Sequence, residues 1–163
     1  MREIVTYPDS VLRETAQPVE EIDDDLRTLI DDMAEVMYDD DGIGLAANQV
    51  GDLRRVIVID AGEGFAVFIN PEIVASGDET ESVEEGCLSL PGIRVNVTRP
   101  TEVTMKAMNL DGEPVKVEAQ GLLARVFQHE TDHLNGKMII DHASPLQRTM
   151  MKNKLRRLEK EQA

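Results

Sequence analysis

Residues 121–136, GLLARVFQHETDHLNG, constrain the fold most, because their apolar spacing predicts a helix that Gly136 would end. Residues four apart lie on one side of a helix, so His129 and His133 can bind one metal ion together. Glu130 lies beside them, within reach of a water molecule on that ion. His-Glu-x-x-His is shared by many metal-dependent hydrolases, although an ordinary helix with two hydrogen-bonded histidines is the alternative.

A catalytic metal site needs a third protein ligand and an open position. In one class of proteases this ligand is a histidine six residues after the second one, where this chain has Ile139. Another class uses a glutamate on a later helix, and no glutamate occurs in residues 134–158. Asp141 and His142 remain possible ligands, although they directly follow the helix end. The better candidate is Cys87, the only cysteine, because a thiolate and two histidines leave one position open.

Two glycine-containing stretches precede the helix. Cys87 lies in EEGCLSLPG, residues 84–92, where Gly, Pro and Gly favour an unusual backbone path with free N–H groups. By default such a cysteine is a small buried apolar residue. The other stretch is GIGLAANQV, residues 42–50, whose small residues allow close approach of a substrate and whose Gln49 offers an amide donor. A tight turn into a buried strand is the simpler interpretation of this stretch.

Composition restricts the class of protein. The 163 residues suit a single domain, 1–163. Lys and Arg number 17 against 32 Asp and Glu, a net charge of −15, which disfavours a nucleic-acid surface. No apolar run is long enough to span a bilayer. A single cysteine cannot form an internal disulfide, which fits a reducing cytosol, so we expect a cytoplasmic protein that binds neither membrane nor a specific nucleic-acid sequence.

The order of elements predicts an α+β fold with antiparallel sheets. The first helix is expected over 23–41, and Asp111-Gly112 predicts a hairpin turn. The expected strands cover 54–60, 65–70, 102–109 and 114–120. A last helix is expected over 144–159, with apolar contacts through Leu146, Met150, Leu155 and Leu158.

Three stretches together, GIGLAANQ, EGCLS and QHETDH, resemble the three signature motifs of the peptide deformylase family in order and spacing. The likeness also covers YPDSVLRETAQPV, INPEI and SPLQR, and so almost the whole chain. It implies antiparallel β-sheets packed around a central helix that carries the His-Glu-x-x-His motif, with a C-terminal helix. It also implies removal of the formyl group from the N-terminal formyl-methionine of new polypeptides, with release of formate.

The resemblance assigns roles to residues. It implies that Cys87, His129 and His133 bind the metal, usually Fe(II), with nickel, cobalt or zinc as substitutes. Glu130 is implied to be the general base and acid. Gln49 and the backbone N–H of Leu88 are implied to hold the oxyanion.

Further residues are expected around this centre because they lie next to the motifs. An apolar pocket for methionine is predicted from Ile43, Leu122 and Val126. Backbone pairing with an extended peptide is predicted at Gly44 and Gly86. Glu85 and Asp132 either steer the metal ligands or are ordinary solvated acids, and Arg94 could brace Glu85 or contact the substrate.

Two rival functions and one surface remain open. A zinc endopeptidase would use Asp141 or His142 as its third ligand, and a metal-stabilised binding module would leave Glu130 and Gln49 without a role. The basic C-terminal stretch QRTMMKNKLRRLEK either compensates the helix dipole or docks weakly on the ribosome.

Overall fold

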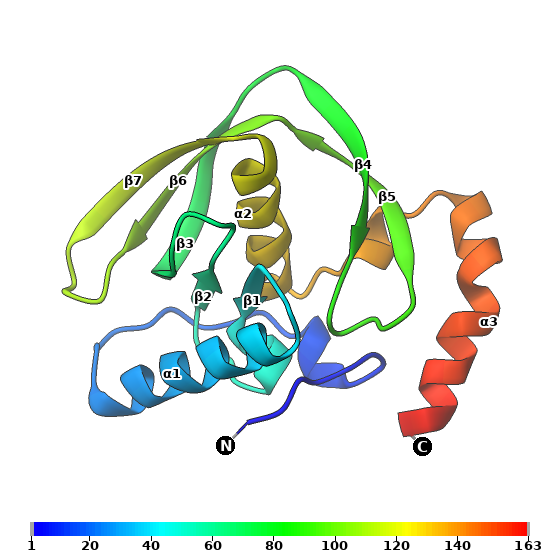
Figure 1. Ribbon diagram of the computed structural model, residues 1–163, viewed down its shortest axis with the longest axis horizontal. Coiled ribbons are helices and arrows are strands. Elements are labelled where there is room, and N and C mark those ends of the chain that lie inside the picture. Colours follow the sequence, from blue (N-terminus) through cyan, green and yellow to red (C-terminus); the bar gives the residue numbers. More distant parts are fainter. Residues whose placement is uncertain (1, 163) are drawn as a thin grey trace.

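The computed structural model describes residues 2–162, which form three α-helices, seven β-strands and three short 3-10 helices (Figure 1). The α-helices are α1 (Asp24–Asp39), α2 (Gly121–Leu134) and α3 (Pro145–Gln162). The strands are β1 (Gly44–Ala46), β2 (Val56–Ile59), β3 (Ala66–Ser76), β4 (Thr80–Gly86), β5 (Arg94–Pro100), β6 (Glu102–Met108) and β7 (Pro114–Gln120). The 3-10 helices are η1 (Ser10–Arg13), η2 (Ala47–Val50) and η3 (Ile139–His142).

The strands form two antiparallel sheets. The larger has five strands in the order β1-β2-β3-β6-β7, and the smaller is the two-stranded β4–β5 ribbon. Gly112, with a φ of +78°, lies in the predicted turn between β6 and β7. The α+β class with antiparallel sheets is therefore confirmed. The ribbon was not among the expected strands.

Helices cover both faces of the larger sheet, which explains why all four side chains of β2 are buried. Val56 and Val58 pack with the apolar side of α1 in one cluster. Ile57 and Ile59 point the other way, as alternate residues of a strand must, and pack with α2 around Phe127. A third cluster joins β5, η1, η3 and α3.

The first helix follows the predicted pattern. Asp23 precedes it and accepts a hydrogen bond from Leu26 N at 2.9 Å, so the free N–H groups of the first turn are partly satisfied. The helix buries the apolar stripe Leu26, Leu29, Ile30, Met33, Val36 and Met37. Asp39 and Asp40 at its end are exposed, as a solvated face predicts.

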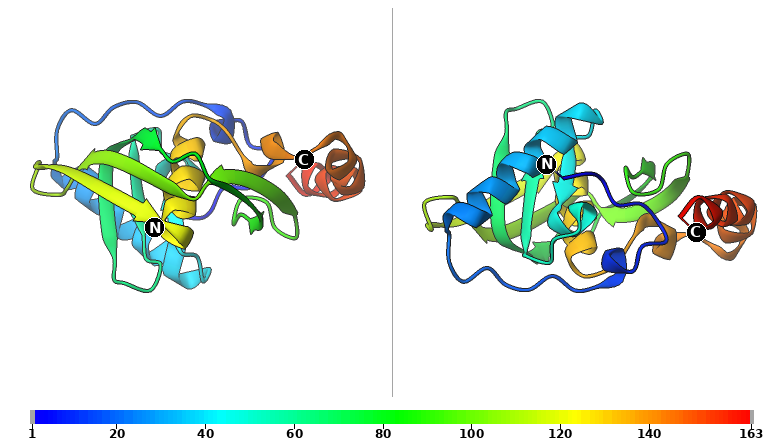
Figure 2. Two further views of the ribbon diagram at one scale, coloured as in Figure 1. Left: turned by 90° about the horizontal axis from the view of Figure 1, so that it is seen from above. Right: turned by 90° about the horizontal axis from the view of Figure 1, so that it is seen from below.

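The central helix α2 lies between the larger sheet and the β4–β5 ribbon, both in the view of Figure 1 and when seen from above or below in Figure 2. It ends at Leu134, and Gly136 follows with a φ of +76°. A Cβ atom at Gly136 would also collide with the carbonyl group of Arg13. Only glycine meets both conditions without strain, so the predicted helix end is confirmed.

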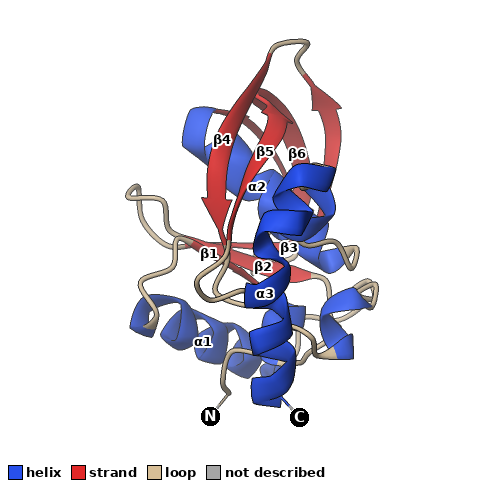
Figure 3. Ribbon diagram, turned by 90° about the vertical axis from the view of Figure 1, so that its right-hand side faces the viewer, coloured by secondary structure: helices blue, strands red, loops and turns tan. Residues whose placement is uncertain are grey.

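The last helix lies on the far side of the ribbon from the larger sheet (Figure 1), so it faces the viewer in Figure 3. The predicted contacts through Leu146 and Met150 are wrong, because these side chains are 70% and 74% exposed. The buried side carries Met151 and Leu158, which pack with the ribbon in the third cluster. Tyr7 Oη also donates to Glu159 at 2.8 Å. Between residues 2 and 162, no helix has the length and apolar character needed to cross a membrane.

Candidate metal centre and active site

Cys87, His129 and His133 meet at the centre of the molecule. One ligand atom from each lies within 4.8 Å of the others, and this is the only such group that the described part of the chain contains. The helix α2 supplies the two histidines, whose ring centroids are 5.0 Å apart. Cys87 directly follows β4, and its Sγ lies 3.3 Å from His133 Nε2. The thiol and the imidazoles therefore come from different structural units.

The hydrogen bonds around the histidines fit a metal site. Glu85 Oε1 lies 2.9 Å from His129 Nδ1, which leaves Nε2 of that ring to face the thiol. Such a carboxylate fixes the ring orientation of a metal-binding histidine. His133 is 1% exposed and its Nδ1 has no partner among the described residues. A soft thiolate and two imidazoles form a donor set suited to Fe, Co, Ni or Zn.

Glu130 is 4% exposed, and its Oε1 has no hydrogen-bond partner among residues 2–162. Burial raises the pKa of this carboxyl group to about 7, while the neighbouring His129 acts in the opposite direction. A group with such a pKa can both accept and donate a proton near neutral pH. Gly44 faces it: a Cβ there would lie 2.7 Å from Glu130 Oε2 and 2.9 Å from Val126 Cγ1.

Gln49 and Leu88 approach the same centre from two loops. Gln49 lies in η2, where its Oε1 accepts a hydrogen bond from Ala46 N at 3.0 Å. This bond turns its Nε2 toward Ser89 Oγ, at 3.2 Å, and Cys87 Sγ, at 3.6 Å. Nothing in residues 2–162 accepts a hydrogen bond from Leu88 N. Among the described residues, Leu88 N is thus a donor without an acceptor next to the thiol, and Gln49 Nε2 is a second donor that here points to Ser89 Oγ and Cys87 Sγ.

The N-terminal segment ties these two loops together. Val5 N donates to Gln49 O at 2.6 Å, and Tyr7 N donates to Ser89 O at 2.8 Å. The two donors, Val5 N and Tyr7 N, are two residues apart in the chain. Backbone contacts from residues 5–7 therefore fix the distance between η2 and the loop that follows Cys87.

A cavity of about 650 Å³ opens onto the centre and is lined by Cys87, His129 and Glu130. All five residues predicted to bind substrate also line it, namely Ile43, Gly44, Gly86, Leu122 and Val126. Ile43 and Leu122 are 42% and 56% exposed, so they lie toward its mouth. The structure thus brings the predicted substrate residues to the cavity that two of the candidate ligands, Cys87 and His129, line.

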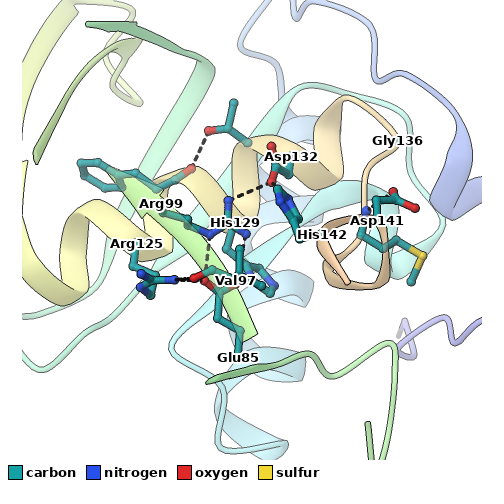
Figure 4. A network of polar contacts seen from close by, with 12 residues as sticks. Glu85, Val97, Arg99, Arg125, His129, Asp132, Gly136, Asp141 and His142 are labelled. Carbon is teal, nitrogen blue, oxygen red and sulfur yellow. Dashed lines mark hydrogen bonds and ion pairs between the residues drawn. The ribbon is translucent and has the colours of Figure 1, made fainter. Parts of the chain in front are cut away.

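Glu85 lies at the centre of a buried ion-pair network (Figure 4). Arg99 donates to it from Nε at 2.7 Å and from Nη2 at 3.0 Å, and Arg125 Nη1 donates at 2.5 Å. With His129 Nδ1, these donors give each carboxylate oxygen two partners. Burial alone would raise the pKa of Glu85, but His129 and Arg99 outweigh it and hold the pKa far below its ordinary value.

Asp132 joins this network from the other side, 2.9 Å from Arg99 Nη1 and 3.1 Å from His142 Nε2 (Figure 4). Asp141 pairs with Arg13 at 2.5 Å. Neither of the alternative third ligands, Asp141 or His142, therefore belongs to the group of three around Cys87.

Arg94 does not brace Glu85, contrary to one of its two expected roles. Its nearest carboxylate is Glu84, at 3.9 Å, and its side chain is 65% exposed at the cavity. Arg99 and Arg125 brace Glu85 instead, and the sequence analysis missed both. The sequence does contain a signal for Arg99. It follows Val95 and Val97 on the buried face of β5, and a buried arginine requires a charged or polar partner.

Comparison with known proteins decides the family. The family model described as Polypeptide deformylase matches residues 1–149. The chain belongs to the peptide deformylase family. A peptide deformylase of Stutzerimonas stutzeri is 48% identical, with 98% of this chain and 97% of that protein covered. Peptide deformylase 1 of Pseudomonas syringae pv. tomato is 50% identical, with 96% and 95% covered.

Solved structures of peptide deformylases share the fold. The crystal structure of one from Legionella pneumophila has a TM-score of 0.91 at 45% identity and covers 99% of this chain and 97% of that one. As a peptide deformylase, this protein is a metal-dependent hydrolase of protein biosynthesis that removes the N-terminal formyl group from new polypeptides. The expected family, fold and reaction are confirmed.

Proposed function

We propose that Cys87, His129 and His133 hold one divalent ion, with Fe(II) as the physiological metal and Ni(II), Co(II) or Zn(II) as substitutes. The observation that carries this proposal is the meeting of their ligand atoms within 4.8 Å, beside a buried Glu130 with an unpaired oxygen. An ion on these ligands would act as a Lewis acid and lower the pKa of a water molecule toward neutrality.

Glu130 moves the proton in this proposal. Its carboxylate accepts a proton from the water that attacks the formyl carbon, and then gives the proton to the leaving amine. A pKa of about 7 suits both steps. Charge develops on the formyl oxygen, where Gln49 Nε2 and Leu88 N donate hydrogen bonds. One such donor is typically worth about 10²–10³ in rate.

The cavity walls accommodate the rest of the substrate. Ile43, Leu122 and Val126 provide apolar surface for the methionine side chain. Gly44 and Gly86 lie on β1 and β4, where the backbone can pair with an extended peptide whatever its sequence. Glu85 orients His129, and Asp132 supports Glu85 through Arg99.

Release of formate from formyl-Met-Ala-Ser tests the roles. We expect Glu130→Gln to keep its metal and lose activity by several orders of magnitude. Glu84→Gln, an exposed carboxylate at the same cavity, should remain active. Loss of metal from Glu130→Gln would assign that residue as a ligand. Cys87→Ala should lose metal, and retention of a full equivalent would remove the thiol from the site.

Labelling tests the thiol without an activity assay. Cys87 is the only cysteine, so iodoacetamide reports on this site alone. We expect slow labelling of the metal-loaded protein and fast labelling after chelation, because a coordinated thiolate is not free to react. Equal rates would contradict the proposed ligand set.

We also propose that α3 docks weakly on the ribosome and that the protein acts in the cytoplasm as one domain, residues 1–163. Residues on α3 form an exposed basic surface, namely Arg148, Lys152, Lys154, Arg156, Arg157 and Lys160. Reversing the charge of Arg156 and Arg157 should weaken co-sedimentation with ribosomes in a salt-dependent way and spare turnover of a short formyl-peptide. Equal co-sedimentation at low salt would reject the docking.

A further inference from the structure

Asn48 is a fully buried polar residue on η2, directly before the proposed oxyanion donor Gln49. Its exposed fraction is 0%, and the other positions of this short helix include the buried apolar residues Ala47 and Val50. Taking an amide out of water is unfavourable unless its donor and acceptor atoms find partners. A buried asparagine in these surroundings therefore indicates a specific contact.

The amide nitrogen of Asn48 makes that contact with the main chain of His133. Asn48 Nδ2 donates a hydrogen bond to His133 O, which is 85 positions away in the chain. The same oxygen accepts from Gly136 N at 3.0 Å, so both of its lone pairs are used. Because His133 is the last residue but one of α2, Asn48 joins η2 to the end of the helix that carries the histidines.

The amide oxygen of Asn48 and the ring of His133 have complementary requirements. Asn48 Oδ1 and His133 Nδ1 are both buried, and neither has a hydrogen-bond partner among residues 2–162. His133 Nε2 faces Cys87 Sγ at 3.3 Å, so a ring that binds a metal through Nε2 carries its proton on Nδ1 and is a donor there. Buried water molecules commonly join a donor and an acceptor that protein atoms leave unpaired.

We propose that Asn48 is a positioning residue for His133. Nδ2 holds the main chain of the histidine, and Oδ1 accepts the hydrogen bond of its Nδ1 through one buried water molecule. This inference rests on the proposed role of His133 as a metal ligand. Glu85 fixes the ring of His129 in the same sense, so each histidine of the centre has a polar partner that sets its orientation.

Metal affinity tests this role without an activity assay. Asn48→Leu is similar in size to the wild type and has no polar atom at the contact. Competition with a chelator should show that it binds Co(II) about 10- to 100-fold more weakly, the usual effect of losing the partner of a metal-binding histidine.

Asn70→Leu is the matched control. Asn70 also pairs with the backbone, accepting from Val19 N at 2.7 Å and donating to Val19 O at 2.9 Å, but it lies on β3 and outside the group of three ligands. This variant should lose stability in urea unfolding and keep the Co(II) affinity of the wild type.

Nuclear magnetic resonance of the Zn(II)-loaded protein tests the contact with the ring. The chain has three histidines, so substitution of each one can assign the imidazole N–H signals. In the wild type, the Nδ1 proton of His133 should give a downfield signal that is protected from exchange with solvent. In Asn48→Leu this signal should move upfield and exchange faster, whereas the signal of His129, which Glu85 holds, should stay. The smaller Asn48→Ala replaces the leucine variant in both measurements if leucine prevents folding.

Wild-type Co(II) affinity in a folded Asn48 variant would overturn the inference, as would an unchanged Nδ1 signal of His133. Equal loss of Co(II) affinity in Asn70→Leu would also overturn it, because the effect would then follow from stability alone. Unchanged Co(II) affinity in His133→Ala would instead reject the proposed metal site.

Discussion

Arg125 donates to Glu85 Oε2 at 2.5 Å, and the same guanidinium reaches both strands of the β4–β5 ribbon. It donates to Val97 O at 2.9 Å and to Glu81 O at 2.7 Å. Arg125 belongs to α2, which carries the histidines, whereas the ribbon leads into Cys87. One side chain therefore cross-links the two units that supply the candidate ligands.

Replacing Arg125 with leucine should lower the affinity for Co(II) by about 10- to 100-fold, a usual effect of losing a residue that holds a ligand in place. The thiolate-to-cobalt charge-transfer band should weaken, because the ribbon no longer holds Cys87 against the histidines. Arg55→Leu is the matched control. Arg55 also donates to two carbonyl groups and one side-chain oxygen, but none of these lies on the ribbon. Equal loss of the band in both variants would show a general effect on folding.

Glu130 should make the stability of the metal-free protein depend on pH. Burial raises its pKa from 4.5 to about 7, so the stability that it contributes is present below pH 4.5 and lost as pH rises through 7. The stability of Glu130→Gln should not fall in this way, because an amide does not ionise. Urea unfolding should show similar stability for both proteins at pH 5 and a variant more stable at pH 8, on the order of 2–3 kcal/mol. A difference that is the same at both pH values would contradict this account.

Gly44→Ala should lower kcat/KM by roughly ten-fold or more while the metal is retained, since a 1 Å misplacement of a catalytic group is costly. The new Cβ would lie within 2.9 Å of both Glu130 and Val126, so either the carboxylate or the cavity wall must shift. Gly77→Ala serves as the control because its Cβ would meet nothing closer than 3.5 Å. Full activity of the Gly44 variant would show that the carboxylate tolerates displacement.

Adjacent methionines on α3 provide a test of its packing. Met151 is 6% exposed and Met150 is 74% exposed. Met151→Ala should lower the free energy of unfolding by about 2 kcal/mol, whereas Met150→Ala should change it little. Denaturant unfolding measures both. A larger effect at Met150 would show that the helix packs through its other side.

Much of this fold could be predicted, because its long elements have strong local signals. The stripe of α1, the caps and the terminal glycine of α2 are all visible in the sequence. The ribbon was missed for a physical reason: in β4 only Glu85 is buried, so TESVEEG lacks the apolar alternation that identifies a strand. The face of α3 was also mistaken, since Leu146 and Met150 lie one turn apart just as Met151 and Leu155 do, and only tertiary packing distinguishes them.

One part of the candidate site could likewise be predicted from the sequence, and another part could not. The ligands and Glu130 lie in short motifs whose chemistry can be recognised, and the structure brings them together. The supporting arginines cannot be found by motif, because Arg99 and Arg125 act through contacts between distant segments. Arg94 is closer in sequence to Glu85 than either of them, yet it points to the cavity mouth. Proximity in sequence therefore predicted the wrong arginine as the partner of Glu85.

The bridge formed by residues 5–7 should tolerate some substitutions but no change in the length of the chain. Both of its contacts, to Gln49 and to Ser89, are made by main-chain atoms. The hydrogen bonds themselves therefore do not depend on side-chain identity, and Val5 needs only an apolar side chain that packs on the third cluster, whereas the number of residues between the two contacts is fixed. A single-residue deletion there would misalign two loops that are forty positions apart, so this stretch should accept substitutions that keep its packing and exclude insertions and deletions.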